Sequence, residues 1–402
     1  MSFRFAHMAD CHLGSWSSHP EMKNMPLVAF EKAIDQCIAE DVDFIIIAGD
    51  LLDTSLPGVD VLSRAASVFR KCHEAAIPVY LIAGSHDYSP TGKTMLSVFE
   101  NAGLVIDVAK YEEDGEKIKL KFTTDKKTGT KITGIFGRKG SLEVDSFKKI
   151  NIPEEEGDKI FVFHCGIDEH NAIMGANYVP VSLLPENFDY YATGHIHIKK
   201  VYETIRGKVA FPGPLFPTSF DELENYDSGF YIVEKKGKDV NVSWRSIKLF
   251  DTLMIENDAT DKTPNEVENS VIDALGESSL KNNVVLVKLH GVLKSGKPSD
   301  IDFKLISSKV ADLGAIIMKK NISKLSSREM EEVTVENIAN LDELEKKIIA
   351  EHAGRMQISG KKDIEHLLMG LMNVLKEEKG EDETNASYEE KIKENAKKLL
   401  EL

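Results

Sequence analysis

Short apolar runs alternate with helix-like segments over the first hundred residues. Three strand-like runs, at 4–10, 43–50 and 79–87, are separated by residues 25–40 and 58–76, where apolar positions recur at helical spacing. Strands and helices that alternate in this way predict βαβ units and an α/β sheet. In such sheets the ligand site lies beyond the carboxyl ends of the strands. The residues that directly follow these strands are therefore the candidates for chemistry.

Beyond about residue 104 the pattern becomes richer in β structure. Residues 117–137 predict a hairpin that turns around Lys126–Gly129, and two more strands are predicted at 159–166 and 188–197. Residues 251–325 mix helix-like and strand-like stretches, and the chain from about 329 is charged and helical. We therefore expect three domains, which cover residues 1–250, 251–328 and 329–402.

The composition restricts the class of protein. The chain has 402 residues, 42% of them hydrophobic, and a net charge of −16. That charge disfavours non-specific adsorption to nucleic acid, although a local basic groove or bound cations would compensate for it. No apolar run is long enough to span a bilayer and we expect no secretory signal, hence no membrane association. The four cysteines form no CxxC pair, which favours a reduced, cytoplasmic protein.

Carboxylate and imidazole side chains follow five of the predicted strands. In chain order the strand ends read Asp-x-His, Gly-Asp, Gly-Ser-His-Asp, His and Gly-His-x-His, at Asp10, His12, Asp50, His86, His164, His195 and His197. In each Asp-x-His or His-x-His pair, the two-residue period of a strand would place both side chains on one face. Carboxylates and imidazoles gathered at one edge suit a two-metal site for Mn²⁺, Fe or Zn²⁺. Core packing does not explain so ordered a set.

The consecutive residues Ser85, His86 and Asp87 are the residue types of a hydrolytic triad. A triad needs the hydroxyl within reach of the imidazole, and three consecutive side chains diverge, so we expect none here. Asp87 has two interpretations: it orients His86 from behind, or it caps the segment that follows. Cys11 and Cys165 lie next to candidate ligands, and we expect both to point away as small core residues.

The ordered strand ends resemble those of the calcineurin-like metallophosphoesterase superfamily over roughly residues 3–235. The opening FAHMADCHLG, the spacing to GHIH, the small following unit and the helical end are most similar to one group within it. That group is the DNA double-strand-break repair nuclease, the meiotic-recombination-eleven family of archaea and eukaryotes, called SbcD in bacteria. The resemblance implies an α/β fold: a four-layer metallophosphoesterase sandwich at 1–250, a small α/β capping domain at 251–328 and a helical, partner-binding tail at 329–402.

The same resemblance implies roles for the site residues. Two divalent metal ions, expected to be manganese, would be bridged by Asp50. One coordination shell would be completed by Asp10, His12 and His197, and the other by His164 and His195. His86 would lie beside the scissile phosphate as an acid or transition-state stabiliser. Ser85 stands where the family usually has Asn, so we expect a metal ligand of shorter reach in a working but altered site.

Two further positions depart from the family pattern. Asp53 stands where the family often has His, and Pro214 stands where it tends to have Ser. Three functions are therefore weighed. The preferred one is a manganese-dependent DNA exonuclease and endonuclease that processes double-strand breaks for repair by homologous recombination. The alternatives are a generic phosphoesterase (a phosphatase or small phosphodiesterase) and a DNA-repair scaffold with weakened catalysis.

An amphipathic pattern marks residues 363–378. Apolar side chains recur at i, i+3, i+4 and i+7, on Ile364, Leu367, Leu368, Leu371, Met372 and Leu375. Such a stripe packs on its own domain or docks in the groove of a partner. The resemblance favours docking, because in that family C-terminal helices grip the coiled coil of an ABC-type ATPase. It also implies a homodimer that acts on DNA ends.

Overall fold

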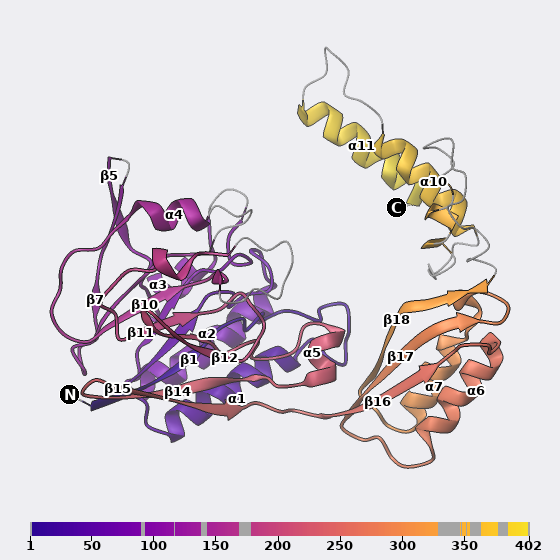
Figure 1. Cartoon of the computed structure of the whole chain (residues 1–402), viewed down its shortest axis with the longest axis horizontal. Coiled ribbons are helices and arrows are strands. Elements are labelled where there is room, and N and C mark those ends of the chain that lie inside the picture. The colour runs from indigo at the N-terminus through magenta and orange to yellow at the C-terminus, as the bar shows by residue number, and fades with distance from the viewer. Residues whose placement is uncertain are drawn as a thin grey trace. The chain divides into compact units, whose positions relative to one another are not determined.

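The computed structural model describes residues 2–89, 93–115, 117–137, 143–168, 178–328, 346, 348–350, 352–353, 363–376 and 385–400. The chain divides into two compact units, Met1–Asp251 and Thr252–Leu402 (Figure 1). A further boundary at residue 328 stays a prediction. Most of the predicted helical stretch 329–362 lies outside the described residues.

The first sheet of the N-terminal unit is built from βαβ units, as the sequence predicted. Its strand order is β15-β14-β1-β2-β3-β4, and β1 to β4 run parallel. Helices α1 (Met25–Ala39) and α2 (Val59–Glu74) connect β1 to β2 and β2 to β3. The strands are β1 (Ser2–Met8), β2 (Phe44–Ala48), β3 (Val79–Ile82), β4 (Ile106–Asp107), β14 (Gly229–Lys236) and β15 (Asp239–Ser246).

The second sheet also has a parallel centre, with the order β12-β13-β11-β10-β8-β7. Its edges are antiparallel, and β7 and β8 form the predicted hairpin, closed by a hydrogen bond of 2.8 Å from the Asp125 N–H to the Thr130 carbonyl. The strands are β7 (Thr123–Thr124), β8 (Lys131–Gly134), β10 (Lys159–Phe163), β11 (Tyr190–Thr193), β12 (Lys200–Thr204) and β13 (Gly207–Phe211).

Smaller elements complete this unit. A three-stranded sheet contains β5 (Tyr111–Asp114), β6 (Lys117–Leu120) and β9 (Ile150–Asn151). The short helices are α3 (Leu96–Asn101), α4 (Glu143–Lys149), η2 (Val181–Leu183) and α5 (Phe220–Asn225).

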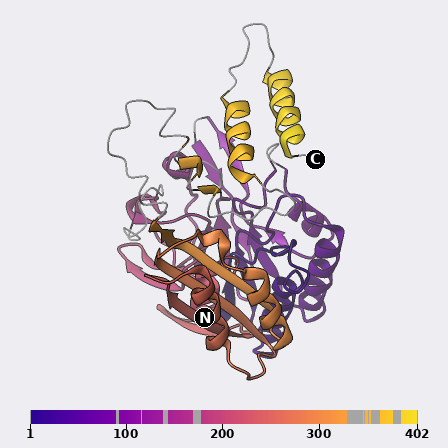
Figure 2. The ribbon, with the colours of Figure 1, turned by 90° about the vertical axis from the view of Figure 1, so that its right-hand side faces the viewer.

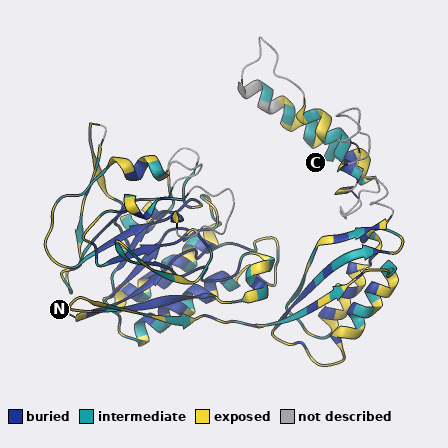
Figure 3. Ribbon diagram, viewed as in Figure 1, coloured by how far each residue is buried: buried dark blue, intermediate teal, exposed yellow. Residues whose placement is uncertain are grey.

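The two six-stranded sheets pack face to face. Phe5 and Ile46 of the first sheet and Val162 and Ala192 of the second belong to one buried cluster. Burying a large apolar side chain in this way stabilises the fold by roughly 1.5–3 kcal/mol before entropy costs. The buried residues accordingly concentrate in the central strands (Figure 3).

Helices cover the outer faces of the sheets. In the second sheet Phe161 and Phe163 face outward and contact Phe147 of α4 edge-on. On the side of the first sheet, α1 and α2 each bury an apolar face and meet through Phe30 and Phe69. Helix, sheet, sheet and helix are the four layers that the sequence predicted. The predicted fold class is therefore confirmed.

The C-terminal unit holds a three-stranded sheet in the order β16-β17-β18, with two long helices in its connections. Thr263 and Glu266 cap α6 reciprocally, which explains why that helix begins at Pro264. Near the end of the chain, α10 and α11 run side by side (Figure 2). The elements are β16 (Asp251–Asp258), α6 (Pro264–Leu275), β17 (Asn283–Leu293), η3 (Pro298–Asp300), α7 (Phe303–Asp312), β18 (Ile317–Ser327), α10 (Ile364–Leu375) and α11 (Asn385–Leu400).

None of the described helices combines the length and the apolar character that crossing a bilayer requires.

Candidate metal centre

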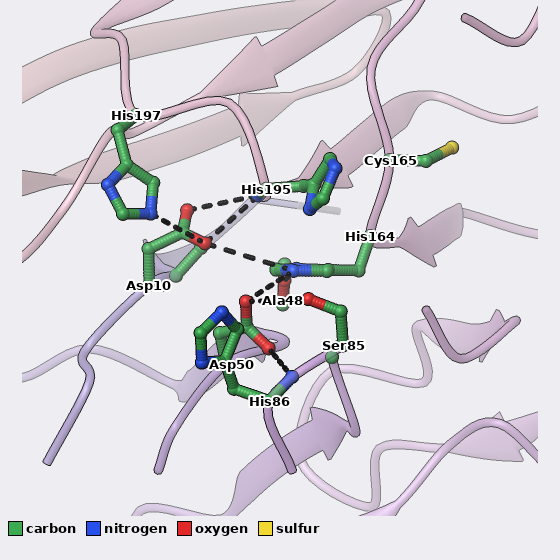
Figure 4. A network of polar contacts seen from close by, with 12 residues as sticks. Asp10, Ala48, Asp50, Ser85, His86, His164, Cys165, His195 and His197 are labelled. Atoms are coloured by element: carbon green, nitrogen blue, oxygen red, sulfur yellow. Dashed lines mark hydrogen bonds and ion pairs between the residues drawn. The ribbon is translucent and has the colours of Figure 1, made fainter. Parts of the chain in front are cut away.

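The candidate site lies where strand ends from both large sheets meet (Figure 4). Every residue that the sequence singled out for chemistry follows one of five strands: Asp10 and His12 follow β1, Asp50 follows β2, Ser85 and His86 follow β3, His164 follows β10, and His195 and His197 follow β11. Contacts among these side chains, given below, bring them into a single site. Their roles as metal ligands stay predictions.

The backbone at these strand ends is not extended. Asp10, His12, Asp50 and His195 have left-handed φ values of 50°, 43°, 49° and 81°. The expectation that each Asp-x-His or His-x-His pair shares one strand face was therefore wrong, because the chain turns before the second residue. A left-handed non-glycine residue costs about 1–3 kcal/mol and tends to occur at functional sites.

The loops after β1 and β2 hold this turned backbone in place. The Asp10 N–H donates to the Gly49 carbonyl and the His12 N–H donates to the Asp50 carbonyl, each over 3.1 Å. Gly84 lies so close to Asp50 that an added Cβ would collide with its backbone N and its Oδ1 atom. Only glycine fits there, so the loop after β3 can press directly against the Asp50 carboxylate.

One cluster of possible ligands contains Asp10, His12 and His197. The Nε2 atoms of His12 and His197 lie 3.2 Å apart, and His197 Nε2 lies 3.7 Å from Asp10 Oδ1. The other ring nitrogen of His197, Nδ1, lies 2.9 Å from Glu222 Oε1. Because an ionised carboxylate only accepts, His197 carries its proton on Nδ1 and turns the lone pair of Nε2 into the cluster.

Glu222 is a site residue that the sequence analysis missed. Burial raises the pKa of its carboxyl group, but the hydrogen bond from His197 outweighs burial and lowers that pKa to about 2. The same contact raises the pKa of His197 against the opposing effect of burial. The only sequence signal was the Ser-x-x-Glu pattern at Ser219–Glu222, which predicts a helix start and not a site.

A second cluster contains Asp50, His164 and His195. His164 Nε2 lies 2.9 Å from Asp50 Oδ2, and His164 Nδ1 lies 2.7 Å from the Ala48 carbonyl oxygen. Burial lowers the pKa of His164, but the Asp50 carboxylate raises it to about 10. Burial likewise raises the pKa of Asp50, and His164 holds it well below its usual range. The bridging of two ions by Asp50 stays a prediction.

These two clusters fit divalent cations. The Nδ1 proton of His164 goes to the Ala48 carbonyl, so its Nε2 can face Asp50 Oδ2 over 2.9 Å only with a second proton on the ring or a cation between the two atoms. A divalent cation would take the place of that second proton. The first cluster likewise directs an imidazole lone pair and a carboxylate into one small space. Mixed carboxylate and imidazole donors suit manganese, iron and zinc.

Ser85 and His86 contact Asp50 from the loop after β3. The Ser85 hydroxyl donates to Asp50 Oδ2 over 3.3 Å, and the His86 N–H donates to Asp50 Oδ1 over 2.7 Å. The His86 ring is exposed, and its Nδ1 lies 2.8 Å from the Asp53 carbonyl oxygen. Ser85 is thus beside the second cluster, and His86 is at the open rim of the site.

Asp87 supports loops and does not orient His86. Its carboxylate accepts from the N–H groups of Gly84 and Leu52 over 2.9 Å each and from Leu51 over 3.3 Å. Burial and the Asp50 charge raise the pKa of Asp87 to about 7. Neither predicted role is observed: Asp87 does not orient His86, and the backbone groups it binds precede it in the chain instead of following it. Since the Ser85 hydroxyl bonds to Asp50, these three residues form no triad, as expected.

The cysteines beside the site are core residues, as predicted. Cys11 and Cys165 are both buried, and Cys165 points away from the other side chains in Figure 4. Burial, reinforced by the Asp10 charge, raises the pKa of the Cys11 thiol well above its usual value. A protonated buried thiol is a poor metal ligand.

Comparison with known proteins identifies the family of the domain that holds this site. The model of the calcineurin-like phosphoesterase family matches residues 3–199, a stretch that contains every predicted site residue. Residues 3–199 form a calcineurin-like phosphoesterase domain. A domain of this family supports metal-dependent phosphoesterase activity with divalent ions.

Two relatives of this chain are DNA double-strand break repair proteins named Mre11. The DNA double-strand break repair protein Mre11 of Archaeoglobus fulgidus is 26% identical over 427 residues, which cover 97% of this chain and 91% of the relative. The protein of the same name from Methanocaldococcus jannaschii is 27% identical over 255 residues, which cover 60% of this chain and 64% of the relative. A dimetal phosphatase structure from Danio rerio is 12% identical, with a TM-score of 0.40, and covers 61% of this chain and 96% of its own. So weak a structural likeness carries no argument about function.

Proposed function

We propose that the protein is a manganese-dependent nuclease that processes the ends of DNA double-strand breaks. The observation that carries this proposal is the pair of neighbouring clusters, Asp10–His12–His197 and Asp50–His164–His195. Bound cations at such a site neutralise phosphate charge and activate a water molecule. The Mre11 names of the relatives support DNA as the substrate.

The site residues would have different roles in the proposed reaction. Asp10, His12 and His197 would hold one ion, and Asp50, His164 and His195 would hold the other with Ser85 beside it. His86 donates its Nδ1 proton to the Asp53 carbonyl, so a neutral His86 ring offers a bare Nε2 to the substrate. It would act as an acid toward the leaving oxygen only when doubly protonated. Such acid catalysis typically contributes roughly 10²–10⁴-fold.

The proposed partner is a coiled-coil ABC-type ATPase, joined through the C-terminal helices of a homodimeric nuclease. The α10 helix supports this part of the proposal. Gly370 of α10 faces Leu399 of α11 and Leu367 is buried, whereas Met372 and Leu375 are 36% and 66% exposed. Among the described residues the apolar stripe is only partly covered, and its far end is exposed, as docking in the groove of a partner would require.

A generic phosphoesterase is the second candidate. The net charge of −16 favours it, because an acidic protein repels the DNA backbone unless bound cations or a partner compensate. Asp53 and Ser85 differ from the residues usual in the nuclease family that this chain resembles, which also favours a generic phosphoesterase.

One assay separates these candidates. Pure protein is incubated with Mn²⁺ and either labelled linear duplex DNA or a chromogenic phosphodiester. We expect metal-dependent degradation of the DNA, lost with a chelator and with the variant Asp50→Ala. Cleavage of the small diester alone would favour the generic phosphoesterase, and cleavage of neither would favour a scaffold.

A further inference from the structure

Asp53 contacts two histidines of the site at once. Its Oδ1 lies 3.4 Å from His12 Nδ1, and its main-chain carbonyl accepts the hydrogen bond from His86. The two imidazole rings are perpendicular, with centroids 4.9 Å apart. The Asp53 side chain is 31% exposed, so it reaches the site from the rim.

His12 needs an acceptor at its Nδ1 atom. This atom is buried and has no partner at hydrogen-bonding geometry among the described residues. An ionised carboxylate attracts it only if Nδ1 carries the proton of the ring. With the proton on Nδ1, the lone pair of Nε2 points into the space shared with Asp10 and His197.

We propose that Asp53 is a positioning residue of the metal centre. Its carboxylate fixes His12 with the proton on Nδ1, and thereby raises the affinity for the cation held by Asp10, His12 and His197. This inference rests on the proposed function, because it requires that cation. Glu222 accepts the Nδ1 proton of His197, so a carboxylate lies beside the Nδ1 atom of each imidazole of the cluster. Supporting groups of this kind typically change metal affinity about 10–100-fold.

The same residues could instead surround a cation of their own, since His12, Asp53 and His86 also form a cluster. A cation there would take the Nδ1 lone pair of His12 and move the ring proton to Nε2. The ring could then no longer bind the ion shared with Asp10 and His197. Two cations would thus compete for one imidazole, and the supporting role is the one compatible with a two-metal centre.

Substitution of the Asp53 side chain leaves the loop intact. The Asp53 N–H donates to the Leu13 carbonyl over 3.1 Å, and Leu13 pairs with Leu52. The bond from His86 goes to the Asp53 main chain and does not depend on the carboxylate. A variant at this position therefore tests the contact with His12 alone.

Calorimetric titration of the full chain with Mn²⁺ tests the inference. Wild-type protein should bind two ions, and Asp53→Ala should weaken one of them about 10–100-fold and leave the other unchanged. Asp53→Asn, whose amide oxygen still accepts a hydrogen bond, should lie between the two. Glu21→Ala, which removes an exposed carboxylate, should bind as wild type. Hydrolysis by Asp53→Ala should return to the wild-type rate at saturating Mn²⁺.

Other outcomes overturn the inference in distinct ways. Unchanged affinity in both Asp53 variants would show that the carboxylate does not position His12. Loss of a third Mn²⁺ equivalent would assign Asp53 to a separate cation site. A lower rate of hydrolysis at saturating Mn²⁺, with unchanged Mn²⁺ affinity, would show that Asp53 acts on the substrate and not on the metal. Failure of the wild-type protein to bind Mn²⁺ would overturn the proposed function itself.

Discussion

At the level of single residues, we expect Ser85 to affect how tightly the proposed second cation is bound. Its hydroxyl lies beside Asp50 Oδ2, the oxygen that also faces His164, but it reaches less far than the Asn of the resembling family. We expect Ser85→Asn to tighten Mn²⁺ binding about fivefold, equivalent to roughly 1 kcal/mol, which is typical of one added polar contact. Activity at limiting Mn²⁺ should rise in parallel.

The control for this prediction is Ser85→Ala, which removes the oxygen and should not tighten binding. A Mn²⁺ titration that is the same for all three proteins would place Ser85 outside the coordination shell.

His86 is expected to act on the substrate and not on the metal. Its ring is exposed at the rim of the site, where its Nδ1 donates to the Asp53 carbonyl. His86→Asn should lower turnover roughly 10²–10⁴-fold while Mn²⁺ affinity and DNA affinity persist. Single-turnover kinetics and a Mn²⁺ titration measure the two effects separately.

His73→Asn, an exposed change on α2, serves as the control and should behave as wild type. If His86→Asn also loses metal, the assignment of His86 to the substrate is wrong.

At the level of elements, Asp87 ties together the loops that follow β2 and β3. Its carboxylate satisfies three buried backbone N–H groups. Asp87→Ala leaves them unpaired, and each unpaired buried group costs about 1–3 kcal/mol. We expect the free energy of unfolding to fall by at least about 3 kcal/mol, measured by urea denaturation. Asp239→Ala, at an exposed end of β15, should change it by less than about 0.5 kcal/mol. An equally small change for Asp87→Ala would contradict this role.

The apolar stripe of α10 is the second element with a testable role. Leu368→Glu combined with Leu371→Glu should abolish co-purification with the ATPase, because docking a helix face buries apolar surface worth roughly 25 cal/mol per Å². Mn²⁺-dependent hydrolysis by the isolated protein should persist, since the candidate site lies within the first compact unit, Met1–Asp251. Asn373→Glu, an exposed position on the same helix, should leave the complex intact.

Two results would contradict this role. Loss of fold stability and activity together would assign the stripe to the core of this protein, and survival of the complex would place the partner elsewhere.

Helices and strands were predictable from sequence where the spacing of apolar residues matched the face that the element buries. The apolar runs at 43–50 and 79–87 predicted strands and contain β2 and β3, and helix α1 lies within one residue of its predicted range. The left-handed turns at Asp10 and Asp50 were not predictable, because positive φ is uncommon for every residue except glycine and the enrichment of Asp there does not single out a position. These turns depend on hydrogen bonds between loops that only the folded sheet brings together.

At the level of the whole molecule, the site exists because two sheets end at the same place. Asp10 and His195 are 185 positions apart, yet the His195 N–H donates to Asp10 Oδ1 over 3.0 Å. The strand-end pattern predicted which residues meet, since each lies directly after an apolar run. It could not predict Glu222, because this residue lies on helix α5 and not directly after a strand, and it reaches His197 only through tertiary packing.

The central claim is that this meeting point holds two divalent cations. Anomalous diffraction from crystals soaked in Mn²⁺ tests it most directly. We expect two peaks about 3.5–4 Å apart. One should lie among Asp10, His12 and His197, and the other among Asp50, His164 and His195. A single peak, or none, at saturating Mn²⁺ would contradict it.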